Sequence, residues 1–262
     1  MKEFYTPGKS PVHEIDARVK LAFTLAFIIF LSLTPSGAWP AYILFLTLAL
    51  SIALLSRVSI GLIQKRALLA LPFALVTLPL IFTGPPPRVD LPFFQTLGIA
   101  YSPEGLVRFV SITLKSWISL QAALLLSATT HISDLLTAFQ QLRIPKLFVA
   151  IIGLMWRYLF LISDEVTRML RARSSRSAIV PGSRGGGNVF WRAKVTGGMA
   201  GSIFLRSIER SDRVYSAMLS RGYTGVLPAS ESQPIAKNDR GYLILGLFLL
   251  MLLWALGLLT GG

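Results

Sequence analysis

Residues 164–225 read DEVTRMLRARSSRSAIVPGSRGGGNVFWRAKVTGGMAGSIFLRSIERSDRVYSAMLSRGYTG, a basic and mostly polar stretch inside an otherwise apolar chain. Two helix-like runs are separated by a glycine-rich break at residues 181–188. Each run ends in a triplet with arginine between two small residues, Ala172-Arg173-Ser174 in the first and Ser220-Arg221-Gly222 in the second. We expect this segment to carry the contacts that the chain makes with partners.

The remaining composition is typical of a membrane protein. Of the 262 residues 53% are hydrophobic, the mean hydropathy is +0.62, and the apolar residues come in blocks long enough to cross a bilayer. The net charge is +14. In a soluble protein this charge would indicate nucleic acid, but in a membrane protein Lys and Arg collect in the cytoplasmic loops. The absence of cysteine excludes disulfides and thiolate metal sites.

Membrane spans are predicted from the uncharged blocks. Residues 21–56 contain no charge, and 36 residues are too many for one span of about 20. The turn signal Pro35-Ser36-Gly37 therefore predicts a helical hairpin. Including this hairpin, the predicted spans are residues 17–34, 38–55, 67–87 (bent by Pro72 and Pro79), 102–130 and 241–262.

The positive charge predicts the orientation of the chain. Four spans from a cytoplasmic N-terminus return the chain to the cytoplasm, and residues 164–240 hold 13 of the 26 Lys and Arg residues. Residues 146–162 are apolar enough to span but carry Arg157, and a single crossing there would move the basic segment outside. We therefore predict one long helix over residues 146–174 at the inner membrane surface. Six spans, with residues 146–162 crossing, is the alternative.

The fold class predicted is an all-α integral membrane protein with about five transmembrane helices plus two long cytoplasmic helices. Three parts are expected: residues 1–130 with four membrane helices, residues 131–225 in the cytoplasm, and residues 226–262 as linker and last span. The second long helix, residues 189–219, carries Gly197, Gly198 and Gly201. Small residues at this density predict that another helix crosses there at close range.

Other charged positions are expected to play smaller roles. Asp16 and Arg18 are predicted to form a charge pair at the membrane surface, and Arg168 and Arg176 are expected to be generic surface charges. No G-x-x-x-x-G-K-[ST] pattern is present, so ATP binding is expected in another chain. With no cysteine and no paired acids in the spans, no metal or proton site is expected.

The chain resembles the transmembrane T component of energy-coupling factor (ECF) transporters over essentially its whole length, most closely the cobalt/nickel type. Tyr5-Thr6-Pro7-Gly8 and the run IDARVKL at residues 15–21 are similar to the family's opening pattern, with Ala17 at the usual proline. In that family two coupling helices end in Ala-Arg-Ser-like and Ala-Arg-Gly-like motifs that dock onto two ATPases. The two triplets match these motifs, with Ser220 in place of alanine.

The resemblance implies a non-catalytic scaffold and energy-coupling subunit in the cell membrane of a prokaryote. Its implied partners are two ATP-binding cassette ATPases, which bind ATP and Mg, a substrate-binding membrane S component and the lipid bilayer, with no nucleic acid. Residues 155–158 and 201–207 are similar to cobalt/nickel T components, whereas the N-terminal Tyr-x-Pro-Gly pattern also occurs in shared vitamin-type ones. A self-sufficient secondary carrier, which would need intramembrane acids or broken helices, and a membrane-anchored nucleic-acid binder are the alternatives.

Overall fold

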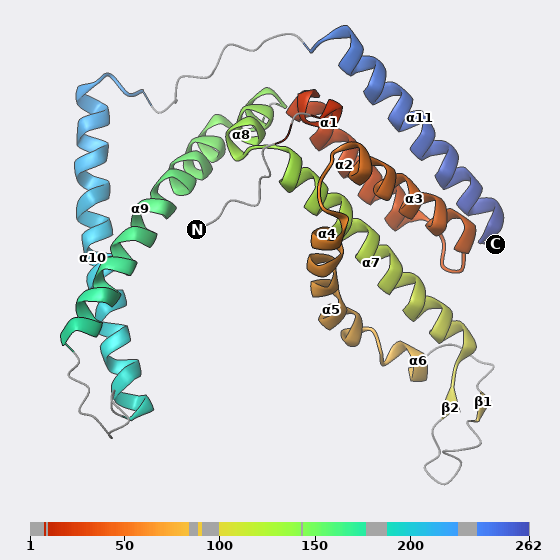
Figure 1. The fold of residues 1–262 in the computed structure, drawn as a ribbon, viewed down its shortest axis with the longest axis horizontal. Helices are drawn as coiled ribbons and strands as arrows, with labels where there is room; N and C mark the ends of the chain where they lie inside the picture. The colour runs from red at the N-terminus through yellow and green to blue at the C-terminus, as the bar shows by residue number, and fades with distance from the viewer. Residues whose placement is uncertain are drawn as a thin grey trace. The chain divides into compact units, whose positions relative to one another are not determined.

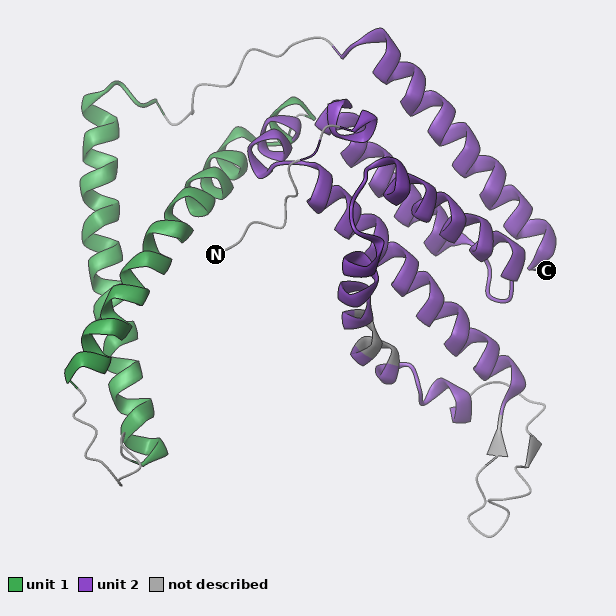
Figure 2. Ribbon diagram, in the orientation of Figure 1, with its two compact units in different colours: residues 1–2, 139–231 green, residues 3–138, 232–262 purple. Residues whose placement is uncertain are grey.

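The computed structural model describes residues 8, 10–83, 89–90, 100–142, 144–176, 188–224 and 235–261. These residues are almost entirely helical (Figure 1), with two two-residue strands, β1 (Val89–Asp90) and β2 (Ala100–Tyr101), paired antiparallel. The helices fall into two units, one within residues 139–231 and one formed by residues 3–138 with 232–262 (Figure 2). We call the first the cytoplasmic unit, after the location that the sequence predicts for it, and the second the membrane unit. Three helices of the described chain are long and apolar enough to cross a membrane, and the predicted all-α membrane fold is confirmed.

Four long helices build the core of the membrane unit: α2 (Ala17–Leu33), α3 (Trp39–Leu55), α7 (Pro103–Thr129) and α11 (Lys237–Thr260). They surround a buried apolar cluster that includes Phe27, Phe45, Ile118 and Leu250. The shorter helices of this part of the chain are α1 (Pro11–Glu14), α4 (Ile60–Ala67), α5 (Leu71–Val76), α6 (Leu80–Thr83) and α8 (Ile132–Gln141), of which α8 runs across the boundary between the units.

The predicted hairpin between the first two long helices is confirmed. Gly37 adopts a φ of 91° in the turn, a left-handed conformation that glycine reaches without a Cβ clash. The turn is tied down by the Tyr42 hydroxyl, which donates to the carbonyl of Pro35 at 2.6 Å. The start of α7 is likewise as predicted, since the Ser102 hydroxyl accepts from the backbone N–H of Gly105 at 3.2 Å, with Pro103 in the first turn.

The continuous helix predicted over residues 67–87 is wrong within the described residues. The chain forms a 3₁₀ turn at Leu68–Ala70, then α5, and then α6 after a break, and all three pieces pack against α7. Pro72 and Pro79, which were expected only to bend one helix, lie at its interruptions. Each proline removes an N–H and clashes with the preceding turn, so the helical ladder is broken rather than curved.

Close glycine packing joins α11 to the hairpin of α2 and α3. A Cβ at Gly257 would lie 2.7 Å from the Thr34 methyl, and one at Gly246 would lie 2.8 Å from the Phe23 ring. Small residues let membrane helices approach closely in this way. The last helix therefore belongs to the same unit as the N-terminal helices, whereas the sequence suggested a separate C-terminal part.

Two lysines connect the antiparallel helices α2 and α7, because each bonds carbonyl groups at the C-terminal end of the other helix. Lys20 near the start of α2 donates to the carbonyl of Thr129, the last residue of α7, at 3.2 Å. Lys115 of α7 donates to the carbonyls of Ser32 and Thr34 at the end of α2. Terminal carbonyls have no partner within their own helix, so these ammonium groups satisfy acceptors that the apolar surroundings would leave unpaired.

The cytoplasmic unit contains the two longest helices, α9 (Lys146–Arg176) and α10 (Val189–Ser220). Their bounds lie within two residues of those predicted from the sequence. At 31 and 32 residues each helix is about 46–48 Å long. The N-terminal part of α9 is apolar enough to cross a membrane by composition, which is why the sequence left its placement open.

Candidate partner-docking interface

Glu165 joins the two long helices of the cytoplasmic unit. Its Oε1 accepts a hydrogen bond from Arg206 of α10 at 2.9 Å, and its Oε2 accepts one from Arg168 of α9 at 2.8 Å. Arg210, one turn further along α10, lies 3.9 Å from Oε2. The hydrogen bonds from Arg168 and Arg206 hold the pKa of the Glu165 carboxyl below its usual value. Arg168, whose side chain is 65% exposed, is therefore a surface charge that also belongs to this cluster.

A second polar contact shows the relative direction of helices α9 and α10. Arg173, near the end of α9, donates to the hydroxyl of Thr196, near the start of α10, at 3.4 Å. Together with the Glu165–Arg206 contact this shows that the two helices run antiparallel, as Figure 1 also shows.

The contacts between α9 and α10 do not use the glycines that the sequence suggested. A Cβ built at Gly197, Gly198 or Gly201 would meet no atom within 4 Å outside its own helix turn and neighbours. The close helix crossing predicted at these positions is therefore absent between α9 and α10. Charged side chains connect the two helices instead, and close glycine contacts form in the membrane unit, at Gly105 of α7 and at Gly246 and Gly257 of α11.

The first triplet lies in the final turns of α9. The helix continues through Ala172, Arg173 and Ser174 and ends two residues later, at Arg176. The Ser174 hydroxyl bonds to the carbonyl of Arg171 at 2.7 Å, as serine does inside a helix. Ala172 and Ser174 are exposed on either side of the half-buried Arg173. The small neighbours leave space around this guanidinium for a partner.

The second triplet ends α10 in a Schellman motif. Gly222 adopts a φ of 80°, its N–H donates to the carbonyl of Leu219 at 2.9 Å, and the N–H of Tyr223 donates to that of Met218 at 3.0 Å. A residue with a side chain is strained at this φ. Gly222 thus sets the chain reversal that follows the exposed Arg221, while Ser220 is the last helical residue.

The two triplet arginines lie toward opposite ends of the cytoplasmic unit. Arg173 contacts Thr196, and from Thr196 to Arg221 the chain advances 25 positions along α10. At 1.5 Å per residue this corresponds to about 37 Å. The interface thus offers two separate guanidinium groups rather than one cluster.

The surface of α9 and α10 exposes many large apolar side chains. No residue of α10 is buried, and Phe204 and Leu205 are 65% and 62% exposed. A cleft of about 500 Å³ lies between the helices, lined by Leu147, Leu154, Tyr158, Ile162, Ser207, Arg210, Ser211, Val214, Tyr215, Met218 and Tyr223. Exposed apolar area on this scale marks a binding surface for protein or membrane.

The predicted juxtamembrane pair is present at the start of α2. Arg18 Nε lies 3.4 Å from the Asp16 carboxylate. Asp16 also caps α2, accepting from the backbone N–H of Arg18 at 2.9 Å, and its own N–H donates to Asp239 of α11 at 3.1 Å. The backbone of Asp16 therefore helps to anchor α11 to the start of α2.

Residues 8–234 match the CbiQ family, which is described as a cobalt transport protein family. The chain belongs to this family. It is 26% identical to the energy-coupling factor transporter transmembrane protein EcfT of Lactococcus lactis, with 96% of each chain covered. It is 27% identical to an uncharacterized protein of Methanocaldococcus jannaschii, covering 96% of this chain and 84% of the relative. A putative fused cobalt transport protein CbiMQ of Methanocorpusculum labreanum is 27% identical over 86% of this chain and 37% of the fused protein.

Sequence reasoning missed Glu165 as the residue that joins α9 to α10 in this CbiQ-family chain. The available signal was its charge: in α9 the acids Asp164 and Glu165 stand alone among basic residues. The stripe of Arg206, Arg210 and Arg213 at helical spacing on α10 is the second signal, because such a stripe needs a counter-charge.

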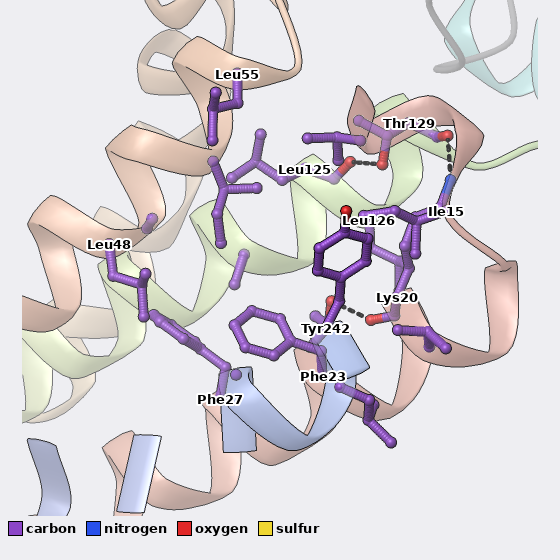
Figure 3. Close-up of a pocket in the computed structure, with 18 of the residues that line it drawn as sticks. Ile15, Lys20, Phe23, Phe27, Leu48, Leu55, Leu125, Leu126, Thr129 and Tyr242 are labelled. Carbon is purple, nitrogen blue, oxygen red and sulfur yellow. Dashed lines mark hydrogen bonds between the residues drawn. The ribbon is translucent and has the colours of Figure 1, made fainter. Parts of the chain in front are cut away.

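The membrane unit of this CbiQ-family chain contains a cavity of about 360 Å³ between α2, α3, α7 and α11. Figure 3 shows the rings of Phe23 and Tyr242 beside it, and Lys20 bonded to Thr129 at one end. The described residues that line the cavity include no Asp, Glu or His. No group of three or more His, Asp and Glu residues that could hold a metal ion occurs in the described part of the chain.

Proposed function

We propose that this chain is the energy-coupling transmembrane subunit of an ATP-driven ECF importer. It would link two ATP-binding cassette ATPases to a membrane subunit that binds the substrate. The observation that carries the proposal is the cytoplasmic unit, in which two antiparallel helices of 31 and 32 residues present Arg173 and Arg221 about 37 Å apart.

The spacing of the two arginines supports docking onto two ATPases. Each guanidinium has five donors in a fixed fork suited to a carboxylate in a partner's groove. The flanking residues Ala172, Ser174, Ser220 and Gly222 are small, so a partner's surface can approach each arginine closely. Closure of the ATPases would displace the docked end of α9 relative to that of α10, and the rigid helices would carry this motion to the membrane.

ATP and Mg are proposed to be bound by the ATPases, and this chain is proposed to be non-catalytic. Its sequence carries no phosphate-binding P-loop. The apolar exposed surface of α9 and α10 is the proposed contact for the substrate-binding subunit and for lipid. Docking of the basic segment onto proteins, rather than nucleic acid, is supported by the large apolar side chains that lie among its arginines.

Cobalt or nickel ions are the proposed cargo. The family description and the fused CbiMQ relative support a metal ion. Shared use for vitamin uptake is the second candidate, because the EcfT relatives match the chain to a similar identity. A self-sufficient carrier is disfavoured by the apolar cavity of the membrane unit, where such a carrier would place polar groups for its substrate.

The proposed location is the plasma membrane of a prokaryote, with five spans and a cytoplasmic N-terminus. The basic residues of α9 and α10 support the cytoplasmic side for this unit. We propose that α9 lies along the inner surface, because crossing the membrane there would separate it from the charged contacts that it makes with α10.

Alanine substitution of the two arginines tests this proposal. In the complete transporter, Arg173→Ala or Arg221→Ala should weaken docking by about 2–5 kcal/mol, the cost of removing one partner of a desolvated charged contact. Either single variant should keep its ATPases but import poorly, and the double variant should lose its ATPases on purification. Arg176→Ala and Arg213→Ala, exposed charges on the same two helices, are the matched controls. A double Arg173/Arg221 variant that retains its ATPases and imports normally would refute the docking role.

A further inference from the structure

We infer that Glu165 is the positioning residue on which α9 and α10 move during energy coupling, and that Arg206 and Arg210 are its alternative partners. The inference rests on the proposed function, because it assigns a role to a residue that touches neither ATPase-docking triplet. The contact is asymmetric, because one carboxylate on α9 faces two arginines one turn apart on α10.

The distances distinguish a hydrogen-bonded partner from an ion pair at longer range. Arg206 is hydrogen-bonded to Glu165 at 2.9 Å, whereas Arg210 lies at 3.9 Å. The two arginines are four residues apart, which is about 6 Å along the helix axis. A one-turn shift of α10 against α9 would therefore bring Arg210 to the place of Arg206 while the carboxylate stays paired. Shifts of one helical turn past a neighbour are a known way in which proteins switch between two packed states.

The surroundings allow this exchange. Arg168, on the same helix as Glu165, bonds to Oε2 at 2.8 Å and keeps that side of the carboxylate fixed while α10 moves. Arg210 lines the 500 Å³ cleft between the helices, so its side chain has space to change rotamer. The glycines at 197, 198 and 201 make no close contact that would lock the pair.

The charges around the contact favour a paired carboxylate in both states. The groups facing Glu165 are Arg168 from α9 and Arg206 and Arg210 from α10. Its side chain is 18% exposed, so loss of its partners would leave a charge partly shielded from water.

The experiment uses the complete transporter, with Glu165→Gln as the variant that keeps the shape and removes the charge. Asp164→Asn, the adjacent exposed acid of α9, is the matched control. Glu165→Gln should keep its ATPases on purification but import two- to fivefold less substrate per ATP hydrolysed, the range expected from a partly exposed ion pair. Asp164→Asn should behave as wild type. Equal coupling in wild type and Glu165→Gln would overturn the inference.

Distances between spin labels on α9 and α10 separate a positioning role from a merely structural one. Labels at Thr167→Cys and Ser216→Cys, exposed positions in a cysteine-free chain, should report a distance that shifts when an ATP analogue binds. Arg210→Gln should abolish this shift and leave the nucleotide-free distance unchanged. Glu165→Gln should broaden the distribution of label distances. The double variant Glu165→Arg/Arg206→Glu, which exchanges the two charges, should restore a single narrow distance. A shift that persists in Arg210→Gln, or a charge swap that restores nothing, would overturn the inference.

The two proposals fail separately. If the Arg173 and Arg221 variants keep their ATPases and import normally, the docking proposal is refuted. The label distances of Glu165→Gln and Arg210→Gln would still decide whether the two helices are positioned by this carboxylate.

Discussion

Substitution of Gly257 by leucine tests the packing that holds the membrane unit together. A Cβ at this position would lie 2.7 Å from the Thr34 methyl and 3.3 Å from the Cβ of Ala41, whereas carbon atoms in contact prefer 3.5–4.0 Å. Neither neighbour has room to retreat. Thr34 is buried, and its hydroxyl donates to the carbonyl of Phe30 at 2.9 Å. Ala41 is fully buried in the first turn of α3. Helix α11 would have to move away from the hairpin.

The matched control is Gly241→Leu on the same helix, where a Cβ would meet no atom within 4 Å. Both substitutions gain about 1 kcal/mol of helix propensity, so the comparison isolates the packing cost. Overpacking costs about 1–3 kcal/mol. Because 1 kcal/mol shifts the melting temperature of a chain of this size by about 2–4 °C, the two variants should differ by about 2–12 °C.

Thermal unfolding of the purified chain in detergent, followed by loss of the monodisperse peak on size exclusion, measures this difference. Gly257→Leu should melt below wild type and Gly241→Leu at or slightly above it. Equal melting temperatures for the two variants would refute the close contact between α11 and the hairpin, and with it the assignment of the C-terminal helix to the membrane unit.

Two further predictions concern the cytoplasmic unit. Gly222→Ala places a Cβ at a φ of 80°, at a cost of about 1–2 kcal/mol, so amide exchange at Tyr223 should accelerate about five- to thirtyfold, and Ser220→Ala should not have this effect. The pKa of Glu165 is held below its ordinary value of 4.5 by Arg168 and Arg206, so the contact contributes fully above pH 4.5 and is lost only as the pH falls through the lower, folded-state value. The distribution of distances between labels on α9 and α10 should therefore stay constant from pH 8 to 5 and broaden in more acid solution. Glu165→Gln should abolish this pH dependence.

Much of the helical layout could be predicted from local signals in the sequence. The bounds of α9 and α10 were correct within two residues because charge, periodicity and a glycine-rich break mark them directly. Ser102 and Pro103 placed the start of α7 for a similar reason, since a cap and a first-turn proline act within one turn. These features depend on a residue's own neighbours along the chain and need no knowledge of the tertiary structure.

Long-range packing could not be read in the same way. The density of glycines on α10 predicted a helix crossing there, yet close contacts form at isolated glycines, Gly105 of α7 and Gly246 and Gly257 of α11. Density shows only that an approach is sterically allowed. Which allowed approach occurs depends on the shape of the opposing helices, here the α2–α3 hairpin with Phe23 and Thr34 at the contact. The breaks at Pro72 and Pro79 show the same limit, because α7 supplies the packing that stabilises the short pieces.

The contact at Glu165 could not be predicted from the sequence either, because it depends on the distance between two helices and not on the residues of one. An acid in a basic helix can pair with a neighbour such as Arg168, and from the sequence this i,i+3 pair would account fully for Glu165. The structure adds Arg206 at 2.9 Å and Arg210 at 3.9 Å from the facing helix. Arg206 is hydrogen-bonded to Oε1, whereas Arg210 lies at longer range from Oε2, to which Arg168 is already bonded. In the inferred shift Arg210 would take the place of Arg206, so that α10 stays attached to Glu165 as it moves.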